Sequence, residues 1–197
     1  MIYWRSSNYA KGVELIVLSG PGGVGKSTVS EYLRKNSEGI WVSVSMTTRA
    51  PRAGEIDGID YYFCSESEFK AKIDEGAFLE WAHFAGNYYG TPRSAVAAEI
   101  SAGRAVLLEI EISGARQVRA AWDSAYLVFL APPSFSELER RLLGRGTDTP
   151  ERAAQRLEIA HEEMAQSHWF DEVLINSSVE EVAARLIALA SQPRQIG

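Results

Sequence analysis

Short, mostly apolar runs alternate along the chain with stretches in which apolar residues recur every three or four positions. The runs at residues 13–19, 105–108, 126–130 and 173–175 have the length and composition of buried strands. Near the carboxyl end, residues 179–190 carry apolar side chains at helical spacing, which predicts a helix with one core-facing stripe. Strands that alternate with helices predict an α/β fold with a mainly parallel sheet.

Residues 45–92 interrupt this alternation with clustered glycine, tyrosine, arginine and acidic residues. Shorter strand-like pieces lie at 61–63 and 78–81, and a helical stretch lies at about 66–74. This segment is predicted to be an inserted mixed α/β subdomain with its own polar face.

A second interruption, residues 132–150, carries Arg140, Arg141 and Arg145, the last within a Gly-Arg-Gly bend. A helix that includes Arg156 is expected to follow. Glycines around an arginine predict a flexible flap whose cations can reach phosphate groups.

Residues 20–27 read GPGGVGKS, a complete GxxxxGKS phosphate-binding loop, or P-loop. The motif requires a buried strand before it and a helix after it, whose free N–H groups face an anion, and both flanks are present. An ordinary glycine-rich turn is the alternative, and the two flanks argue against it. The predicted ATP-binding residues of the loop are Gly20, Pro21, Gly22, Gly23, Val24, Gly25, Lys26, Ser27 and Thr28.

Length and composition limit the range of functions. A chain of 197 residues is long enough for one sizeable domain, and its net charge of −6 argues against a nucleic-acid backbone as its partner. No apolar run reaches the roughly 20 residues that span a bilayer, and residues 1–12 do not resemble a secretory signal. Cys64 is the single cysteine. A soluble, cytoplasmic protein without a membrane partner is expected.

Longer motifs are more specific than the P-loop. Residues 47–55 read TTRAPRAGE, and residues 87–90 read NYYG. The chain resembles the guanylate kinase family in these blocks, with further matches in the right order, over about residues 13–189. The resemblance implies a P-loop NTPase core with a mainly parallel five-stranded sheet, a GMP-binding insert and a helical lid. It implies transfer of the γ-phosphoryl group of ATP to GMP, with Mg²⁺ as cofactor.

The resemblance also sets the expected limits of these parts within a single domain, residues 1–197. They are an N-terminal extension at 1–12, the core at 13–44, 93–131 and 157–191, the GMP-binding subdomain at 45–92, the lid at 132–156 and a tail at 192–197.

Arg49 and Arg52 are the predicted clamp for the GMP phosphate, because a dianion favours paired guanidinium groups and Pro51 between them limits local flexing. Tyr61 and Tyr89 could donate phenolic O–H groups to the same phosphate, and by resemblance they bind it. Packing within the insert is the alternative for the tyrosines.

Glu80 matches the family's guanine-reading glutamate. A carboxylate complements the adjacent N1–H and N2–H₂ donors of guanine, whereas adenine would leave it without a donor. A solvated strand carboxylate is the alternative. By resemblance, the GMP-binding set is completed by Ser45, Gly90, Thr91 and Glu109.

Phosphoryl transfer is mainly electrostatic, so no general base or covalent nucleophile is expected. Lys26 acts from the ATP side and Arg49 from the GMP side, while Arg141, Arg145 and Arg156 match lid arginines that converge on the phosphates. A solvated helix face paired with nearby glutamates is the alternative for the lid arginines.

Two glutamates follow the predicted strand at 105–108, where a P-loop protein places its metal-associated carboxylate. The family usually has an aspartate where Glu111 stands, so we rank Glu109 first and Glu111 second as Mg²⁺ residues beside Ser27. Asn176 matches a position near the ATP adenine.

Two other functions compete with GMP phosphorylation by ATP. Another small-molecule kinase could share the P-loop, and a non-catalytic guanylate-kinase-like module could bind phosphopeptides, although such modules typically lose the intact loop. The use of dGMP and the oligomeric state stay open.

Overall fold

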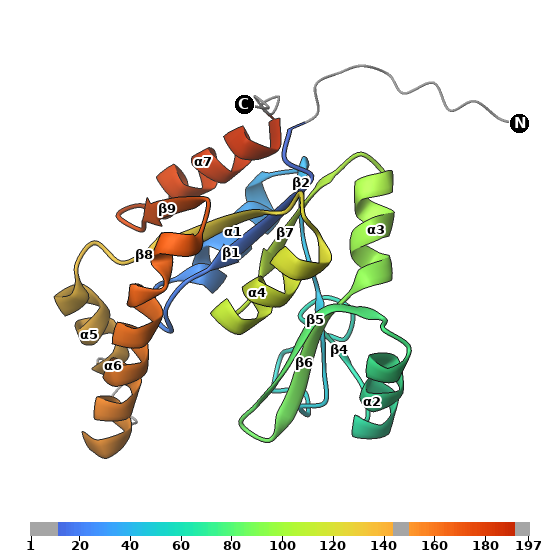
Figure 1. Ribbon diagram of the computed structural model, residues 1–197, viewed down its shortest axis with the longest axis horizontal. Helices are drawn as coiled ribbons and strands as arrows, with labels where there is room; N and C mark the ends of the chain where they lie inside the picture. Colours follow the sequence, from blue (N-terminus) through green and yellow to red (C-terminus); the bar gives the residue numbers. More distant parts are fainter. Residues whose placement is uncertain (1–11, 144–149, 192–197) are drawn as a thin grey trace, which may run out of the picture.

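A five-stranded parallel sheet forms the centre of this computed structural model, which describes residues 12–143 and 150–191 (Figure 1). The strands are ordered β2-β7-β1-β8-β9. The α/β fold with a five-stranded parallel sheet is therefore confirmed. The bounds are Leu15–Ser19 for β1, Ile40–Val42 for β2, Ala105–Glu109 for β7, Tyr126–Ala131 for β8 and Glu172–Ile175 for β9.

The central strand β1 is apolar without interruption because both of its faces are covered. Ile16 and Leu18 belong to one apolar cluster, and Leu15 and Val17 belong to another. All four side chains are fully buried. Continuous apolar runs of this kind are typical of parallel sheets that carry helices on both faces.

Helices α1 (Lys26–Asn36) and α7 (Val179–Ser191) contribute to the first cluster, which includes Leu33 and Leu186. Helices α3 (Arg93–Ser101) and α4 (Ile112–Ala121) contribute to the second. The predicted stripe of the last helix is confirmed, since its buried residues are Val182, Ala183, Leu186 and Leu189.

The insert contains a separate four-stranded sheet in the order β4-β3-β6-β5. Its only parallel pair is β3–β4. Figure 1 shows this part on one side of the core, with α2 covering it. The bounds are Ser45–Thr47 for β3, Tyr61–Phe63 for β4, Glu66–Asp74 for α2, Phe78–Phe84 for β5 and Asn87–Pro92 for β6.

Helix α2 begins at a reciprocal cap in which the Ser65 and Glu68 side chains each accept the other's backbone N–H. Its buried Phe69 stacks on Phe78 of β5 and Tyr88 of β6, with ring centroids 4.5 and 5.4 Å apart. The insert therefore has a small aromatic core of its own.

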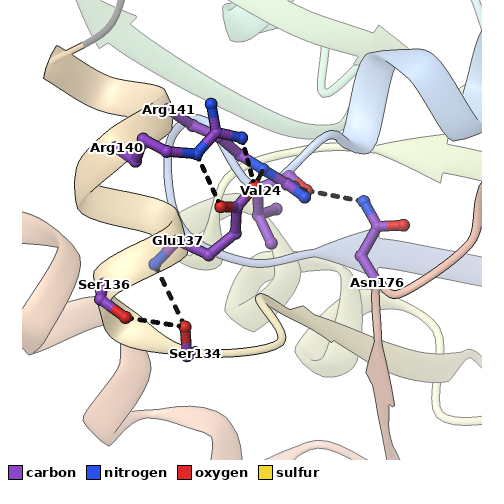
Figure 2. Close-up of polar contacts among 7 residues, drawn as sticks. All are labelled: Val24, Ser134, Ser136, Glu137, Arg140, Arg141 and Asn176. Carbon is purple, nitrogen blue, oxygen red and sulfur yellow. Dashed lines mark hydrogen bonds and ion pairs between the residues drawn. The ribbon is translucent and has the colours of Figure 1, made fainter.

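Helices α5 (Phe135–Leu143) and α6 (Pro150–Ala165) extend from the core on the side of β8 and β9 (Figure 1). Ser134 precedes α5 and accepts a hydrogen bond from the Glu137 N–H at 3.2 Å, as an N-cap residue does (Figure 2). The Phe135 ring stacks on His161 with centroids 3.6 Å apart, which ties α5 to α6. Within the described part of the chain, no helix is both long and apolar enough to cross a membrane.

Candidate nucleotide-binding site

The P-loop joins the carboxyl end of β1 to α1, which begins at Lys26 as the motif requires. Gly20 and Gly25 are positions at which a side chain would not fit. A Cβ at Gly20 would lie 2.3 Å from the Leu130 carbonyl oxygen, and one at Gly25, where φ is 104°, would lie 2.6 Å from the Asn176 amide nitrogen. A side chain at either position would disturb the turn, so the glycine spacing has a local structural cause.

Lys26 lies across the loop that precedes it. Its Nζ donates hydrogen bonds to the Gly20 carbonyl at 2.6 Å and the Pro21 carbonyl at 3.2 Å, and the side chain is buried. The positive charge is therefore held within the curve of the P-loop, where an anionic group on the loop amides would meet it.

The Ser27 hydroxyl donates a hydrogen bond to the Glu109 carboxylate at 2.6 Å. The two residues meet because β1 and β7 are parallel neighbours, with Leu18 in register with Glu109. Glu111 instead precedes α4, and its side chain is exposed. Of the two candidate carboxylates, Glu109 is the one in contact with the P-loop serine.

Oxygen donors of this kind suit Mg²⁺, which favours carboxylates and hydroxyls and usually keeps phosphate and water oxygens as further ligands. Among the described residues, no group of three or more His, Cys, Asp or Glu side chains is placed to hold a metal ion. Ser27 and Glu109 therefore fit a shared site with a nucleotide better than a site made of protein groups alone.

Side chains from the carboxyl-terminal half of the chain hold the P-loop from outside. Figure 2 shows Arg141 Nη1 and Asn176 Nδ2 both donating to the Val24 carbonyl, at 3.2 and 2.7 Å. Asn176, expected near the adenine, is buried against the loop. The Glu163 carboxylate of α6 accepts a hydrogen bond from the Gly22 N–H at 3.1 Å.

Glu163 was not predicted from the sequence, where it is one of many glutamates on a helical stretch. Burial raises the pKa of its carboxyl, and the nearby Glu111 adds to this effect, while the hydrogen bond from Gly22 and the charge of Lys26 oppose it. A carboxylate thus lies on a P-loop amide close to the lysine that is expected to meet the ATP phosphates.

The arginines expected in the lid are placed unequally. Arg141 Nε pairs with Glu137 at 2.8 Å, and Arg140 pairs with the same carboxylate (Figure 2). These bonds lower the pKa of Glu137 to about 2. Arg156 lies on α6 with an exposed side chain, and Arg145 lies outside the described residues.

In the insert, Arg49 lies over the Tyr61 ring with its guanidinium carbon 5.2 Å from the ring centroid, and Tyr89 packs edge-on against Tyr61 at 6.2 Å. Burial raises the pKa of the Tyr61 hydroxyl. Three of the four residues expected at the GMP phosphate therefore lie together. The fourth, Arg52, has an exposed side chain.

Glu55 ends the TTRAPRAGE block and organises this cluster, a role that the sequence alone does not indicate. Its carboxylate accepts a hydrogen bond from Arg49 Nη2 at 2.7 Å and another from the Arg52 backbone N–H at 2.7 Å. These bonds lower the pKa of Glu55, and the pairing raises that of Arg49.

Glu80 on β5 is buried, with 6% of its surface exposed, so it is not a solvated strand carboxylate. Thr91, directly opposite on β6, donates its hydroxyl to Glu80 Oε1 at 2.6 Å. Burial raises the pKa of Glu80, the bonds from Thr91 oppose that rise, and the charge of Glu111 adds to it. Gly90 precedes Thr91 on β6, and Ser45 lies half-buried on β3 in register with Tyr61.

Comparison with known proteins gives consistent matches. The family model described as guanylate kinase matches residues 12–192. A guanylate kinase of Thermobifida fusca is 56% identical over 179 residues, covering 91% of each chain. One of Streptomyces coelicolor is 55% identical over 177 residues, covering 90% of each chain. The crystal structure of guanylate kinase from Anaplasma phagocytophilum is 34% identical, with a TM-score of 0.73 over 96% of this chain and 92% of that one.

Proposed function

Because this chain belongs to the guanylate kinase family and is an ATP:GMP phosphotransferase, we propose that its P-loop holds the ATP phosphates while its four-stranded insert holds GMP. Two clusters support this division. One is the turn around Lys26 at the end of β1, and the other is the Arg49, Tyr61 and Tyr89 group in the insert. Each cluster offers donors for an anionic phosphate.

On the ATP side, the loop amides and Lys26 bind the phosphates, and Thr28 follows Ser27 into the first turn of α1. Mg²⁺ would be held by Ser27 and Glu109, with Glu111 as the second candidate. The ion supplies charge stabilisation at the transferred phosphoryl group. The 2.6 Å contact between Ser27 and Glu109 supports the order of these two glutamates.

On the GMP side, Arg49 and Arg52 clamp the phosphate, and the hydroxyls of Tyr61 and Tyr89 orient it. A guanidinium carries five N–H donors. Arg49 uses donors on the Ala50 carbonyl and on Glu55, at 2.8 and 2.7 Å, and its other donors can meet a phosphate while Glu55 holds the side chain in place.

Glu80 reads the guanine base. In its ionised form the carboxylate accepts hydrogen bonds from the adjacent N1–H and N2–H₂ donors, while Ser45 and Thr91 contribute hydroxyls at the base. Adenine presents an acceptor where guanine presents N1–H. A buried carboxylate facing that acceptor loses its partner, which costs more than losing a neutral hydrogen bond.

Transfer then depends on position and charge. The GMP phosphate oxygen attacks the γ-phosphorus of ATP, and ADP leaves, so Lys26, Arg49 and the lid arginines Arg141, Arg145 and Arg156 stabilise negative charge spread over the moving group. Closure of the lid over the phosphates excludes water, which would otherwise accept the phosphoryl group in place of GMP. Asn176 supports the nucleotide site from beneath the loop.

The buried Glu80 carboxylate, held by Thr91 at the face of the insert sheet, is the observation that carries this proposal. A coupled assay of ADP formation from ATP tests it, with GMP, dGMP, AMP, CMP and UMP compared in the wild type and in Glu80→Gln. We expect the wild type to prefer GMP strongly. Glu80→Gln should lose this preference because its KM for GMP rises. Comparable turnover of GMP, AMP, CMP and UMP by the wild type would contradict the guanine-reading role. The cytoplasmic location stays a prediction.

A further inference from the structure

Helix α4 of the core reaches across to the edge of the insert sheet. Strand β5 ends that sheet, so within the described residues the outward-facing N–H and C=O groups of Trp81 have no neighbouring strand. The Gln117 side chain takes that place: its Oε1 accepts from the Trp81 N–H at 3.1 Å, and its Nε2 donates to the Trp81 carbonyl at 2.8 Å. The Gln117 side-chain amide thus makes the two hydrogen bonds that a neighbouring strand would make, and it makes them at Trp81, directly after Glu80.

Gly114 lies one turn earlier on α4, on the same face as Gln117. A Cβ built at this glycine would lie 2.7 Å from Glu80 Oε2 and 3.2 Å from its Cδ, closer than real Cβ atoms approach a neighbouring oxygen. The Glu80 carboxylate therefore rests on the bare backbone of α4. One oxygen of this carboxylate bonds to Thr91, and the other lies against Gly114.

We propose that Gly114 and Gln117 are positioning residues for guanine recognition, which rests on the proposed role of Glu80. Gln117 fixes the backbone next to Glu80, and Gly114 leaves room for the carboxylate at the orientation that Thr91 holds. A carboxylate that must accept from two adjacent donors of a planar base is sensitive to such placement, because hydrogen bonds weaken steeply when the angle departs from linearity.

Helix α4 also begins directly after β7, whose last residue, Glu109, contacts Ser27. The short segment from β7 to α4 therefore connects Glu109, which contacts the P-loop serine, to the α4 residues that support Glu80. A displacement of α4 relative to β5 would change base recognition. A substitution on β5 that leaves α4 in place would leave the contact between Ser27 and Glu109 intact.

Gly114→Ala and Gln117→Met test the proposal in the assay with GMP and AMP. The first adds a methyl group against Glu80, and the second keeps the length of the side chain but removes both bonds to Trp81. We expect the ratio of kcat/KM for GMP to that for AMP to fall by about tenfold in each, through KM for GMP, with KM for ATP changed less than about twofold.

Two matched controls separate positioning from a general loss of stability. Gly39→Ala adds a methyl group where nothing lies within 4 Å. Asn36→Ala removes an exposed side-chain amide that donates to the Tyr32 carbonyl at 2.8 Å, at the end of α1 remote from the P-loop and away from α4. Both should keep the wild-type ratio.

Unchanged selectivity in both α4 variants would overturn the inference, as would equal weakening of GMP and ATP. If Gly114→Ala does not fold, Gln117→Met decides alone, since it preserves volume. Glu80→Gln in the same assay separates the two proposals: selectivity kept by Glu80→Gln contradicts the base-reading role itself. Selectivity lost by Glu80→Gln but kept by the folded α4 variants contradicts only the role of α4.

Discussion

Ser27 on α1 and Glu109 at the end of β7 share a 2.6 Å hydrogen bond, although 82 positions separate them in the chain. If this pair holds Mg²⁺ with the ATP phosphates, Glu109→Gln should lower kcat by about 10- to 100-fold and raise the Mg²⁺ concentration needed for half-maximal rate. Glu111→Gln, the matched control, should change both less. Measuring activity as a function of Mg²⁺ concentration tests both effects. A larger effect of Glu111→Gln than of Glu109→Gln would reverse the ranking of the two glutamates as Mg²⁺ residues.

Lys26→Ala should lower kcat by about 100- to 1,000-fold, because a buried cation at the phosphates stabilises charge that develops during transfer. GMP binding should stay within about twofold of wild type, since GMP is held by the insert. Steady-state kinetics and calorimetry of GMP binding measure the two effects. Lys35→Ala on the same helix is the control, because Lys35 is exposed and pairs with Glu31.

Two substitutions within the P-loop should differ sharply. Gly22→Ser should keep activity within about threefold, because a Cβ there meets nothing within 4 Å and the N–H to Glu163 is retained. Gly25→Ala should lose most activity, because φ is 104° and its Cβ would meet Asn176. A left-handed conformation costs a residue with a Cβ about 1–2 kcal/mol before any clash. Equal activity of the two variants would contradict this account of the turn.

GMP binding should depend on the ionisation of Glu80. Burial raises the pKa of this carboxyl, and its protonated form offers guanine a donor where an acceptor is needed. KM for GMP should therefore rise as pH falls through that raised pKa. Thr91→Val removes a bond that lowers the pKa, so its rise in KM should begin at higher pH. Glu80→Gln serves as the control, since any pH dependence left in it comes from other groups.

The same burial affects stability with a definite sign. Because the pKa of Glu80 is raised in the folded state, its ionised form opposes folding above the unfolded-state pKa of about 4.3. The free energy of unfolding of Glu80→Gln should thus rise relative to wild type as pH increases from that value through the folded-state pKa. Chemical denaturation at several pH values measures the difference. A constant difference across that range would show that burial leaves the pKa of Glu80 unchanged.

Local patterns account for the parts of the molecule that were predictable. The β1 run, the P-loop and α1 follow from residues adjacent in the chain, and α2 follows from the Ser65 and Glu68 cap. Strand β5 continues to Phe84, beyond the predicted piece at 78–81, because a tight turn at Ala85 and Gly86, both with positive φ, pairs it with β6. Strands β2 and β3 have three residues each, too few to show a period.

Contacts between distant segments were not predictable in the same way. Gly22 and Glu163 lie 141 positions apart, and Trp81 and Gln117 lie 36 apart. In the sequence, Glu163 and Gln117 look like ordinary solvated side chains on helices. Nothing in the sequence therefore marks their contacts with Gly22 and Trp81. Glu55 ends the TTRAPRAGE block, whose two arginines are predicted to bind phosphate, but its pairing with Arg49 depends on how the loop folds back.

The Val24 carbonyl receives two side-chain donors, and the strand before the loop is covered on both faces. A turn held this firmly already has its shape before a nucleotide arrives. Little of the interaction free energy then goes into ordering the chain, and the amides need not reorganise as charge moves during the reaction.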